Sequence, residues 1–177
     1  MRLAAGALLL AVLAWLALSP PALPALVPVG SEAPAIGPVA TWVVPAGALL
    51  PHGGRALVEG RDEVLLVEFW ATWCPPCRAT HPLLDELARA HAADGLRVVG
   101  VTIPDERQGL GEIQAYGRER AFPSAVLATP QAYISFGVEG IPYALLLDRQ
   151  RRVRWRGQPL GDEGALRAAL REALAAR

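Results

Sequence analysis

Cys74 and Cys77 are the only cysteines in the chain, and two prolines separate them in the segment 73–77, WCPPC. The apolar run at 64–70 ends just before this segment and predicts a buried strand. A helical pattern follows the cysteines, so the pair would lie where a strand turns into a helix. Unpaired N–H groups and the positive end of the helix dipole favour a thiolate at the first cysteine. Since the thiolate is the form that attacks disulfides, the pair predicts thiol-disulfide chemistry.

The elements that would position the cysteines alternate between strands and helices. A buried strand at 64–70, a helix at 78–92 and a second buried strand at 96–103 predict a right-handed crossover with parallel strands. Later patterns predict a helix, a strand, a helix, an antiparallel hairpin and an amphipathic C-terminal helix, at 109–121, 124–128, 131–136, 144–156 and 164–176. Upstream, strands at 42–44 and 55–58 would pair across a turn at 51–54. The sequence therefore predicts an α/β domain.

The first 19 residues differ sharply from the rest of the chain, because positions 3–18 are uninterrupted apolar and follow Arg2. As a helix this run would span about 24 Å at roughly 1.5 Å per residue, which predicts a membrane anchor or an export signal. The prolines after it disfavour a cleavage site, so a retained anchor is the favoured interpretation, and cleavage would give a secreted protein. Segment 20–40, rich in proline and alanine, predicts an extended tether, and 41–177 the folded domain.

The balance of charge also limits the function. The 177 residues carry a formal net charge of zero, so no bulk electrostatic attraction to nucleic acid is expected. The lone Arg2 before the apolar run favours a cytoplasmic N-terminus and a domain on the extracytoplasmic, periplasmic side. That compartment is oxidising, which suits a redox-active cysteine pair.

The segment 68–78, EFWATWCPPCR, together with Gly140-Ile141-Pro142 and the strand at 145–148, resembles thioredoxin-fold proteins. Within that fold it is similar to the membrane-anchored, extracytoplasmic branch of the TlpA, ResA and DsbE type. The resemblance implies a central mixed β-sheet flanked by helices, with an α/β insertion and an N-terminal strand extension. It makes Cys74 the attacking thiol and Cys77 the resolving thiol, and the larger field at the helix start favours the same assignment.

Glu68 is a carboxylate in an otherwise apolar strand, and burial would raise its pKa by desolvation. It stands six residues before Cys74, where the resemblance places the buried acid of thioredoxins. In that role it would accept the proton of Cys77, through a water, when Cys77 attacks the mixed disulfide. The alternative is a glutamate at a strand end whose side chain reaches solvent.

The resemblance also implies a substrate-binding surface beside the cysteines. It places a cis proline at Pro142, where Ile141 would pair its backbone with an extended substrate segment, as in strand addition. The alternative is a trans proline that opens an edge strand. Trp73 is expected on an exposed apolar rim that receives the partner, and Trp70 in the core.

The implied activity is protein-disulfide oxidoreduction. The resemblance implies a reductant of disulfides in exported proteins, often in apocytochrome c maturation, supplied with electrons by a membrane thiol-electron transporter. The dithiol itself carries the electrons, so no cofactor is expected and no metal ligand is assigned. The sequence leaves the direction of electron flow open, because it does not give the reduction potential.

Two other functions remain open at this point. Cys74, Cys77 and His81 would suit a Cu(I) site of a copper metallochaperone for oxidase assembly, because copper prefers soft thiolates. The competing interpretation of His81 is a solvated surface residue. A peroxiredoxin-type peroxidase has only Thr72 in its favour.

Isolated histidines and a run of arginines have plainer interpretations. His52 and His91 are expected at the surface, without a chemical role. The arginines at 149, 151, 152, 154 and 156 form a basic stripe on the predicted hairpin, which we interpret as a solvated edge that discourages strand pairing.

Overall fold

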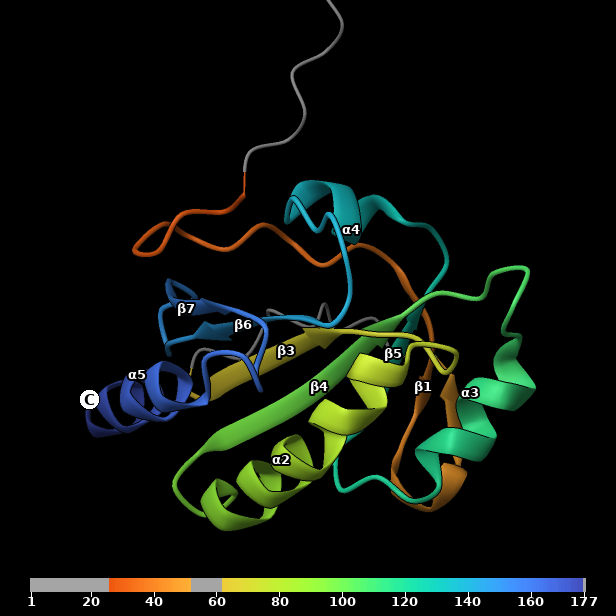
Figure 1. The fold of residues 1–177 in the computed structure, drawn as a ribbon, viewed down its shortest axis with the longest axis horizontal. Helices are drawn as coiled ribbons and strands as arrows, with labels where there is room; N and C mark the ends of the chain where they lie inside the picture. The colour runs from red at the N-terminus through yellow and green to blue at the C-terminus, as the bar shows by residue number, and fades with distance from the viewer. Residues whose placement is uncertain (1–25, 52–61, 177) are drawn as a thin grey trace, which may run out of the picture.

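The structure, a computed structural model, describes residues 26–51 and 62–176 (Figure 1). The predicted anchor at 1–19, the predicted strand at 55–58 and His52 lie outside these residues. In the part of the chain that is described, no helix is both long and apolar enough to cross a membrane.

The predicted crossover is confirmed and forms the centre of the fold. Strand β3 (Val64–Phe69) is followed by helix α2 (Pro75–His91) and strand β4 (Leu96–Thr102). β3 pairs with β4 in parallel and with β6 (Tyr143–Leu147) in the antiparallel sense. All six residues of β3 are buried, as expected for a strand with neighbours on both edges and helices on the faces.

The other elements complete a mixed sheet flanked by helices, the thioredoxin fold (Figure 1). In chain order they are α3 (Leu110–Gly117), β5 (Ser124–Leu127), α4 (Gln131–Ser135), β7 (Val153–Gly157) and α5 (Glu163–Ala175). Together with β1 (Val39–Val43) and β2 (Leu49–Pro51), the sheet has seven strands within the described residues, in the order β2-β1-β5-β4-β3-β6-β7. Each strand and helix predicted from 64 onward is present, with ends shifted by a few residues.

Side chains alternate along β3 and divide the core into two layers. Leu65, Val67 and Phe69 pack on the face that carries α4 and the segment before β1. Val64 and Leu66 pack on the opposite face with apolar residues of α2 and α5. Since successive side chains of a strand point to opposite faces, the next residue on the α2 side is Glu68. The pleat of β3 therefore directs a carboxylate under the helix that begins at the cysteines.

The N-terminal strand pair differs from the prediction. β1 (Val39–Val43) pairs with β2 (Leu49–Pro51), and a 3₁₀ turn (Pro45–Gly47) connects them. The turn is thus at 45–48 rather than at 51–54. In the sequence, Pro-His-Gly-Gly at 51–54 is a stronger turn signal than Ala46-Gly47. The structure nevertheless turns at Ala46 and Gly47, which take the positive φ angles of 69° and 77° that a tight turn requires.

The predicted tether is wrong over its described part. Val27, Ala33 and Ile36 are buried, at 6%, 8% and 2% exposure, in the core layer shared with Phe69. The segment also pairs with β7, where Gly30 N–H donates to the Val153 carbonyl at 2.7 Å. The composition that predicts a spacer instead supplies apolar residues that pack against the sheet.

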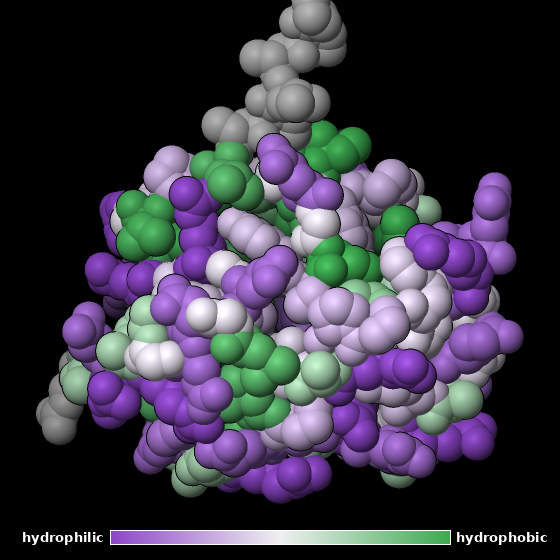
Figure 2. Space-filling view, in the orientation of Figure 1, coloured by the Kyte–Doolittle hydropathy of each residue, from purple (hydrophilic) through white to green (hydrophobic). Residues whose placement is uncertain are grey.

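The predicted basic stripe is also partly buried. Arg151 is 4% exposed and donates to the Glu63 carbonyl at 2.9 Å. Arg149 donates to the carbonyls of Ala173 and Ala176 at the end of α5. These arginines fasten the hairpin to its neighbours, so the stripe is not a solvated edge along its whole length. Figure 2 shows small apolar patches separated by polar areas on the face seen in Figure 1.

Candidate active site

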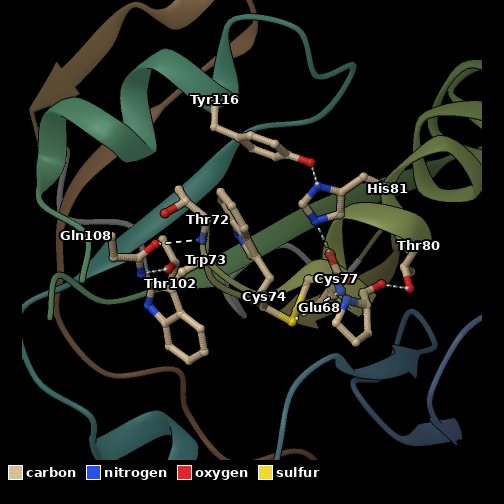
Figure 3. The surroundings of a disulfide bond; sticks show 12 residues. Glu68, Thr72, Trp73, Cys74, Cys77, Thr80, His81, Thr102, Gln108 and Tyr116 are labelled. Carbon is tan, nitrogen blue, oxygen red and sulfur yellow. Dashed lines mark hydrogen bonds and ion pairs between the residues drawn. A yellow bond between two sulfur atoms is a disulfide. The ribbon is translucent and has the colours of Figure 1, made fainter. Parts of the chain in front are cut away.

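The cysteine pair lies at the junction that the sequence predicted. Cys74 is the N-cap of α2, and Pro75 and Pro76 occupy the first helical positions, where a missing N–H costs nothing. The two sulfurs are joined in a disulfide with an S–S distance of 2.10 Å. Cys77 N–H donates to Cys74 Sγ at 3.2 Å (Figure 3). This helix-start donor would also favour a thiolate at Cys74 once the disulfide is reduced.

The two sulfur-bearing residues differ in depth. Cys74 is 3% exposed and Cys77 is 0% exposed. Both belong to a buried cluster with Trp70 and Ile113, and Trp73 and Ile141 pack against it. The order of burial agrees with the assignment of Cys74 as the attacking cysteine, because an incoming disulfide must reach the outer sulfur.

Glu68 is fully buried, so the alternative of a solvent-exposed strand-end glutamate is wrong. Its Oε2 lies 2.8 Å from His81 Nε2, and neither side chain has measurable exposure. Burial raises the pKa of Glu68 by desolvation, and the hydrogen bond and charge of His81 act in the lowering direction but do not cancel the rise. A buried carboxyl with a raised pKa holds a proton more readily than an exposed glutamate does, which suits a group that takes up and releases a proton.

His81 does not lie at the surface, as one interpretation of the sequence held. It is 0% exposed, and its Nδ1 lies 2.9 Å from the Tyr116 hydroxyl (Figure 3). Trp70, Tyr116 and Phe122 surround the imidazole, with ring centroids 5.0 to 5.6 Å away. His81 stands one helical turn after Cys77, on the same buried face of α2. The imidazole is therefore part of the interior directly behind Cys77.

The predicted copper site is not supported by this arrangement. Both ring nitrogens of His81 already have partners, Glu68 and Tyr116. Across residues 26–51 and 62–176, no three His, Cys, Asp or Glu side chains are grouped so that they could hold a metal ion. The spacing of Cys77 and His81 on one helix face was correctly identified, but that face points at a carboxylate.

The segment before Cys74 is held by the loop between β4 and α3. Thr72 N–H donates to Gln108 Oε1 at 2.7 Å, and Gln108 Nε2 donates to Thr102 Oγ1 and to the Ile103 carbonyl at 3.0 and 2.7 Å. Gln108 itself is 2% exposed. A single amide side chain thus joins the end of β4 to the turn that presents Cys74 (Figure 3).

Trp73 is held by the same loop. Its Nε1–H donates to Asp105 Oδ2 at 2.8 Å, and the guanidinium carbon of Arg107 lies 3.3 Å from the centre of the indole ring. Asp105 also accepts the backbone N–H groups of Arg107 and Gln108, which fixes the loop. Trp73 is half-buried rather than fully exposed, so it is a fixed wall of the site, whereas Trp70 is in the core at 1% exposure, as predicted.

A pocket of about 220 Å³ lies beside the cysteines, between Trp73 and the loop before β6. The residues that line it include Trp73, Ile103, Tyr133, Gly140 and Ile141. The Ile141–Pro142 peptide bond is cis, as the resemblance implied. The structure thus brings Trp73 and Ile141 together at one apolar hollow next to Cys74.

Three residues at this site were not predicted from the sequence. Gln108, Asp105 and Tyr116 are ordinary polar residues in and after a loop, with partners about 30 or more positions away. Their only local signal is the short polar stretch 105–108, which follows a buried strand whose end faces the cysteines.

Comparison with known proteins gives a consistent result. A family model described as Redoxin matches residues 44–172. The chain is 35% identical over 132 residues to the thiol:disulfide interchange protein HelX of Rhodobacter capsulatus, covering 72% of this chain and 66% of that protein. It is 36% identical over 146 residues to a thiol:disulfide interchange protein DsbE homolog of Paracoccus denitrificans, covering 77% of this chain and 69% of that protein.

Comparison with solved structures agrees with this result at the level of the fold. The crystal structure of a thioredoxin family thiol:disulfide interchange protein from Chlorobium tepidum superposes with a TM-score of 0.61 at 23% identity, over 82% of this chain and 97% of that one. At that identity the match bears on the fold alone. The chain spans about two thirds of the length of the two sequence relatives.

Proposed function

We propose, since the chain belongs to the Redoxin family, that it is a thiol-disulfide oxidoreductase that exchanges electrons between its Cys74–Cys77 pair and disulfides of partner proteins. The observation that carries the proposal is the cysteine pair itself, closed in a disulfide at a helix N-terminus. Trp73, the residue before Cys74, lines an apolar pocket, and the buried Glu68 contacts His81 on the helix face that carries Cys77. The names of the relatives, thiol:disulfide interchange proteins, support the same activity.

In the reducing direction the reaction has two steps. The Cys74 thiolate attacks one sulfur of a substrate disulfide, forms a mixed disulfide and releases the other substrate sulfur as a thiolate. Cys77 then loses its proton and attacks Cys74 Sγ, which breaks the mixed disulfide, releases the second substrate thiolate and closes the Cys74–Cys77 bond. The substrate disulfide gains two electrons and the protein's dithiol loses them.

Glu68 is the proton acceptor for Cys77 in this proposal. The buried carboxylate lies under the same helix face as Cys77, and its raised pKa suits the transfer of a proton from a buried thiol. Trp73, Ile141 and Pro142 form the substrate-binding surface, where an extended segment of the partner would lie along the backbone before the cis proline.

We further propose an extracytoplasmic, periplasmic location, with residues 1–19 as a single membrane anchor. The apolar run at 3–18 supports the anchor, and an oxidising compartment suits a catalytic disulfide. The partners would be disulfide-containing exported proteins, such as apocytochrome c, and a membrane thiol-electron transporter that reduces the pair again. This part of the proposal rests on the resemblance to the anchored thioredoxin branch.

The equilibrium with glutathione tests both activity and direction. The domain is incubated in glutathione buffers of graded poise, and the Cys74–Cys77 pair is quantified by alkylation of free thiols. A potential well below the poise of the exported compartment supports a reductant, as proposed. A potential above that poise would make the protein an oxidant, and a pair that does not cycle reversibly would refute the activity.

A further inference from the structure

Three side chains from three elements form a continuous row of polar contacts behind Cys77, an ion-pair contact followed by a hydrogen bond. Glu68 comes from β3, His81 from α2 and Tyr116 from α3. The Glu68 Oε2 to His81 Nε2 distance is 2.8 Å, and the His81 Nδ1 to Tyr116 hydroxyl distance is 2.9 Å. Figure 3 shows the imidazole between the carboxylate and the phenol, with one ring nitrogen directed at each.

The two ends of this row have different surroundings. Glu68 and His81 are 0% exposed, and the rings of Trp70 and Phe122 pack against the imidazole. Tyr116, in contrast, is only partly buried. The row therefore begins in the dry interior beneath α2 and ends at a hydroxyl that can exchange protons with solvent.

A buried acid that takes a proton at each reaction must also release it, or the next cycle cannot begin. Aromatic and aliphatic side chains around Glu68 oppose a direct route through bulk water. A histidine is the side chain best able to receive a proton at one ring nitrogen and to donate one from the other. We propose that His81 and Tyr116 carry the proton that Glu68 takes from Cys77 out to solvent at the Tyr116 hydroxyl.

The steps balance, and they rest on the proposed oxidoreductase function. Cys77 gives its proton reversibly to the Glu68 carboxylate, and the Cys77 thiolate persists long enough to attack Cys74 Sγ only once that proton has left Glu68. The carboxyl proton then passes to His81 Nε2, and the proton on Nδ1 passes to the Tyr116 oxygen, whose own proton goes to water. Glu68 returns to the carboxylate, the Cys77 thiolate attacks Cys74 Sγ and releases the substrate thiolate, and one proton has moved from the thiol to solvent. His81 is left with its proton on Nε2, and the same transfers in reverse restore the Nδ1–H form when the pair is reduced again and Cys77 regains a proton.

Several charged groups face this row and will influence its titration. The Arg120 guanidinium lies 5.2 Å from the centre of the Tyr116 ring and is paired with Asp85 at 3.0 Å. Arg78, on the first turns of α2, also acts on Tyr116 through its charge. Burial raises the pKa of Tyr116, so its hydroxyl remains protonated and neutral while it passes protons on.

The test separates the two chemical steps in time. Reduced full-length protein is mixed rapidly with an aromatic disulfide reagent, which releases one coloured thiolate when Cys74 attacks and a second when Cys77 resolves. We expect Tyr116→Phe to slow the second release about tenfold at neutral pH and to leave the first unchanged. The slowing should shrink from about pH 7 toward about pH 9, because hydroxide takes over as the proton acceptor.

His81→Gln and the double variant complete the test. His81→Gln should slow the second release by a similar factor. The double variant should be no slower than the slower single variant, because both residues act in one path. Tyr143→Phe is the matched control, since it removes a phenolic hydroxyl on the opposite face of the sheet, and it should change neither release.

Other results would overturn the path. An unchanged second release in Tyr116→Phe and His81→Gln from about pH 5 to about pH 9 would do so. Equal slowing of both releases at every pH would assign these residues a structural role instead. If wild-type protein gave no second release at all, the proposed oxidoreductase function would fail together with the path. If wild-type protein and both variants gave the second release at the same rate, the path alone would be refuted.

Discussion

The two sides of the Cys74–Cys77 bond are built in opposite ways. On the Cys74 side, a loop at 103–109 holds Thr72 and Trp73 through an amide, a carboxylate and a stacked guanidinium. On the Cys77 side, a carboxylate and an imidazole are enclosed without solvent contact. The first arrangement holds Thr72 and Trp73 in place near the surface, and the second places two titratable side chains in the interior.

The difference indicates a division of labour between the two steps of exchange. The first step needs an accessible thiolate in a defined position, and backbone donors at a helix start supply its charge stabilisation without a proton carrier. The second step needs a proton to leave a buried thiol, which requires a nearby base. Substitutions on the two sides should therefore affect different steps, and the following predictions use that contrast.

The largest effect is expected from the cysteines themselves. Cys74→Ser should abolish disulfide exchange, because no other sulfur lies at the surface end of the pair. Cys77→Ser should instead accumulate a mixed disulfide between Cys74 and the partner, because the resolving thiol is absent. Insulin reduction measures the loss of activity, and non-reducing electrophoresis detects the trapped species. Undiminished insulin reduction in both variants would refute the assigned roles.

Glu68→Gln should slow the second step by about 100-fold and the first step little, because the amide cannot accept the proton of Cys77. Rapid mixing with a disulfide reagent across the range from about pH 6 to about pH 9 measures both steps. Glu86→Gln is a control, since it removes an exposed acid of α2 that pairs with Arg167. Unchanged rates of both steps in Glu68→Gln would remove Glu68 from the mechanism.

Gln108→Ala should affect the opposite step. Without the amide, Thr72 N–H loses its acceptor, and about 1–3 kcal/mol of stability is lost with it. The looser turn should slow attack by Cys74 several-fold while the second step is preserved. Gln114→Ala is the control for loss of stability alone. It removes the hydrogen bond that Gln114, on α3, donates to the Gly47 carbonyl. Equal slowing of the two steps by Gln108→Ala would contradict the division described above.

The smallest effect is expected on the pH dependence of unfolding. Because the pKa of Glu68 is raised in the folded state, the folded protein binds its proton more tightly than the unfolded chain does. The resulting stabilisation is complete below the ordinary glutamate pKa and is lost as pH rises through the raised value, by about 1.4 kcal/mol per unit of difference.

Glu68→Gln should flatten this part of the curve, which denaturant titrations at graded pH will measure. The comparison uses the difference between the wild-type and variant curves, so that groups common to both cancel. If wild-type and variant curves ran parallel over this range, the buried carboxyl would make no contribution of the predicted sign.

Prediction from sequence succeeded where local pattern and chemistry coincide. The buried strand, the two cysteines and the helix after them are adjacent in the chain, so periodicity and capping rules place them correctly. Glu68 was identified because a lone carboxylate in an apolar strand requires an explanation. Its burial follows from the pleat of β3, which puts every second residue beneath α2.

Prediction failed where the partner is remote in sequence. His81 was assigned either to the surface or to a metal, because its spacing from Cys77 gives its helix face but not what that face meets. Tyr116 and Gln108 depend on contacts across 35 and 36 positions, which no short window can detect. The segment at 26–36 was misjudged for a similar reason, since its composition is typical of a linker and only the sheet makes it a packed layer.

That segment has a consequence for the protein in solution. β7 is the last strand on its side of the sheet, and a bare outer strand offers rows of unsatisfied amides to any neighbouring molecule. Here Gly30 and Ser31 bond to Val153 from outside, and Ala33 N–H donates to the Arg151 carbonyl. The stretch at 30–33 thus covers the outer edge of β7, so removing it would expose that strand and favour self-association.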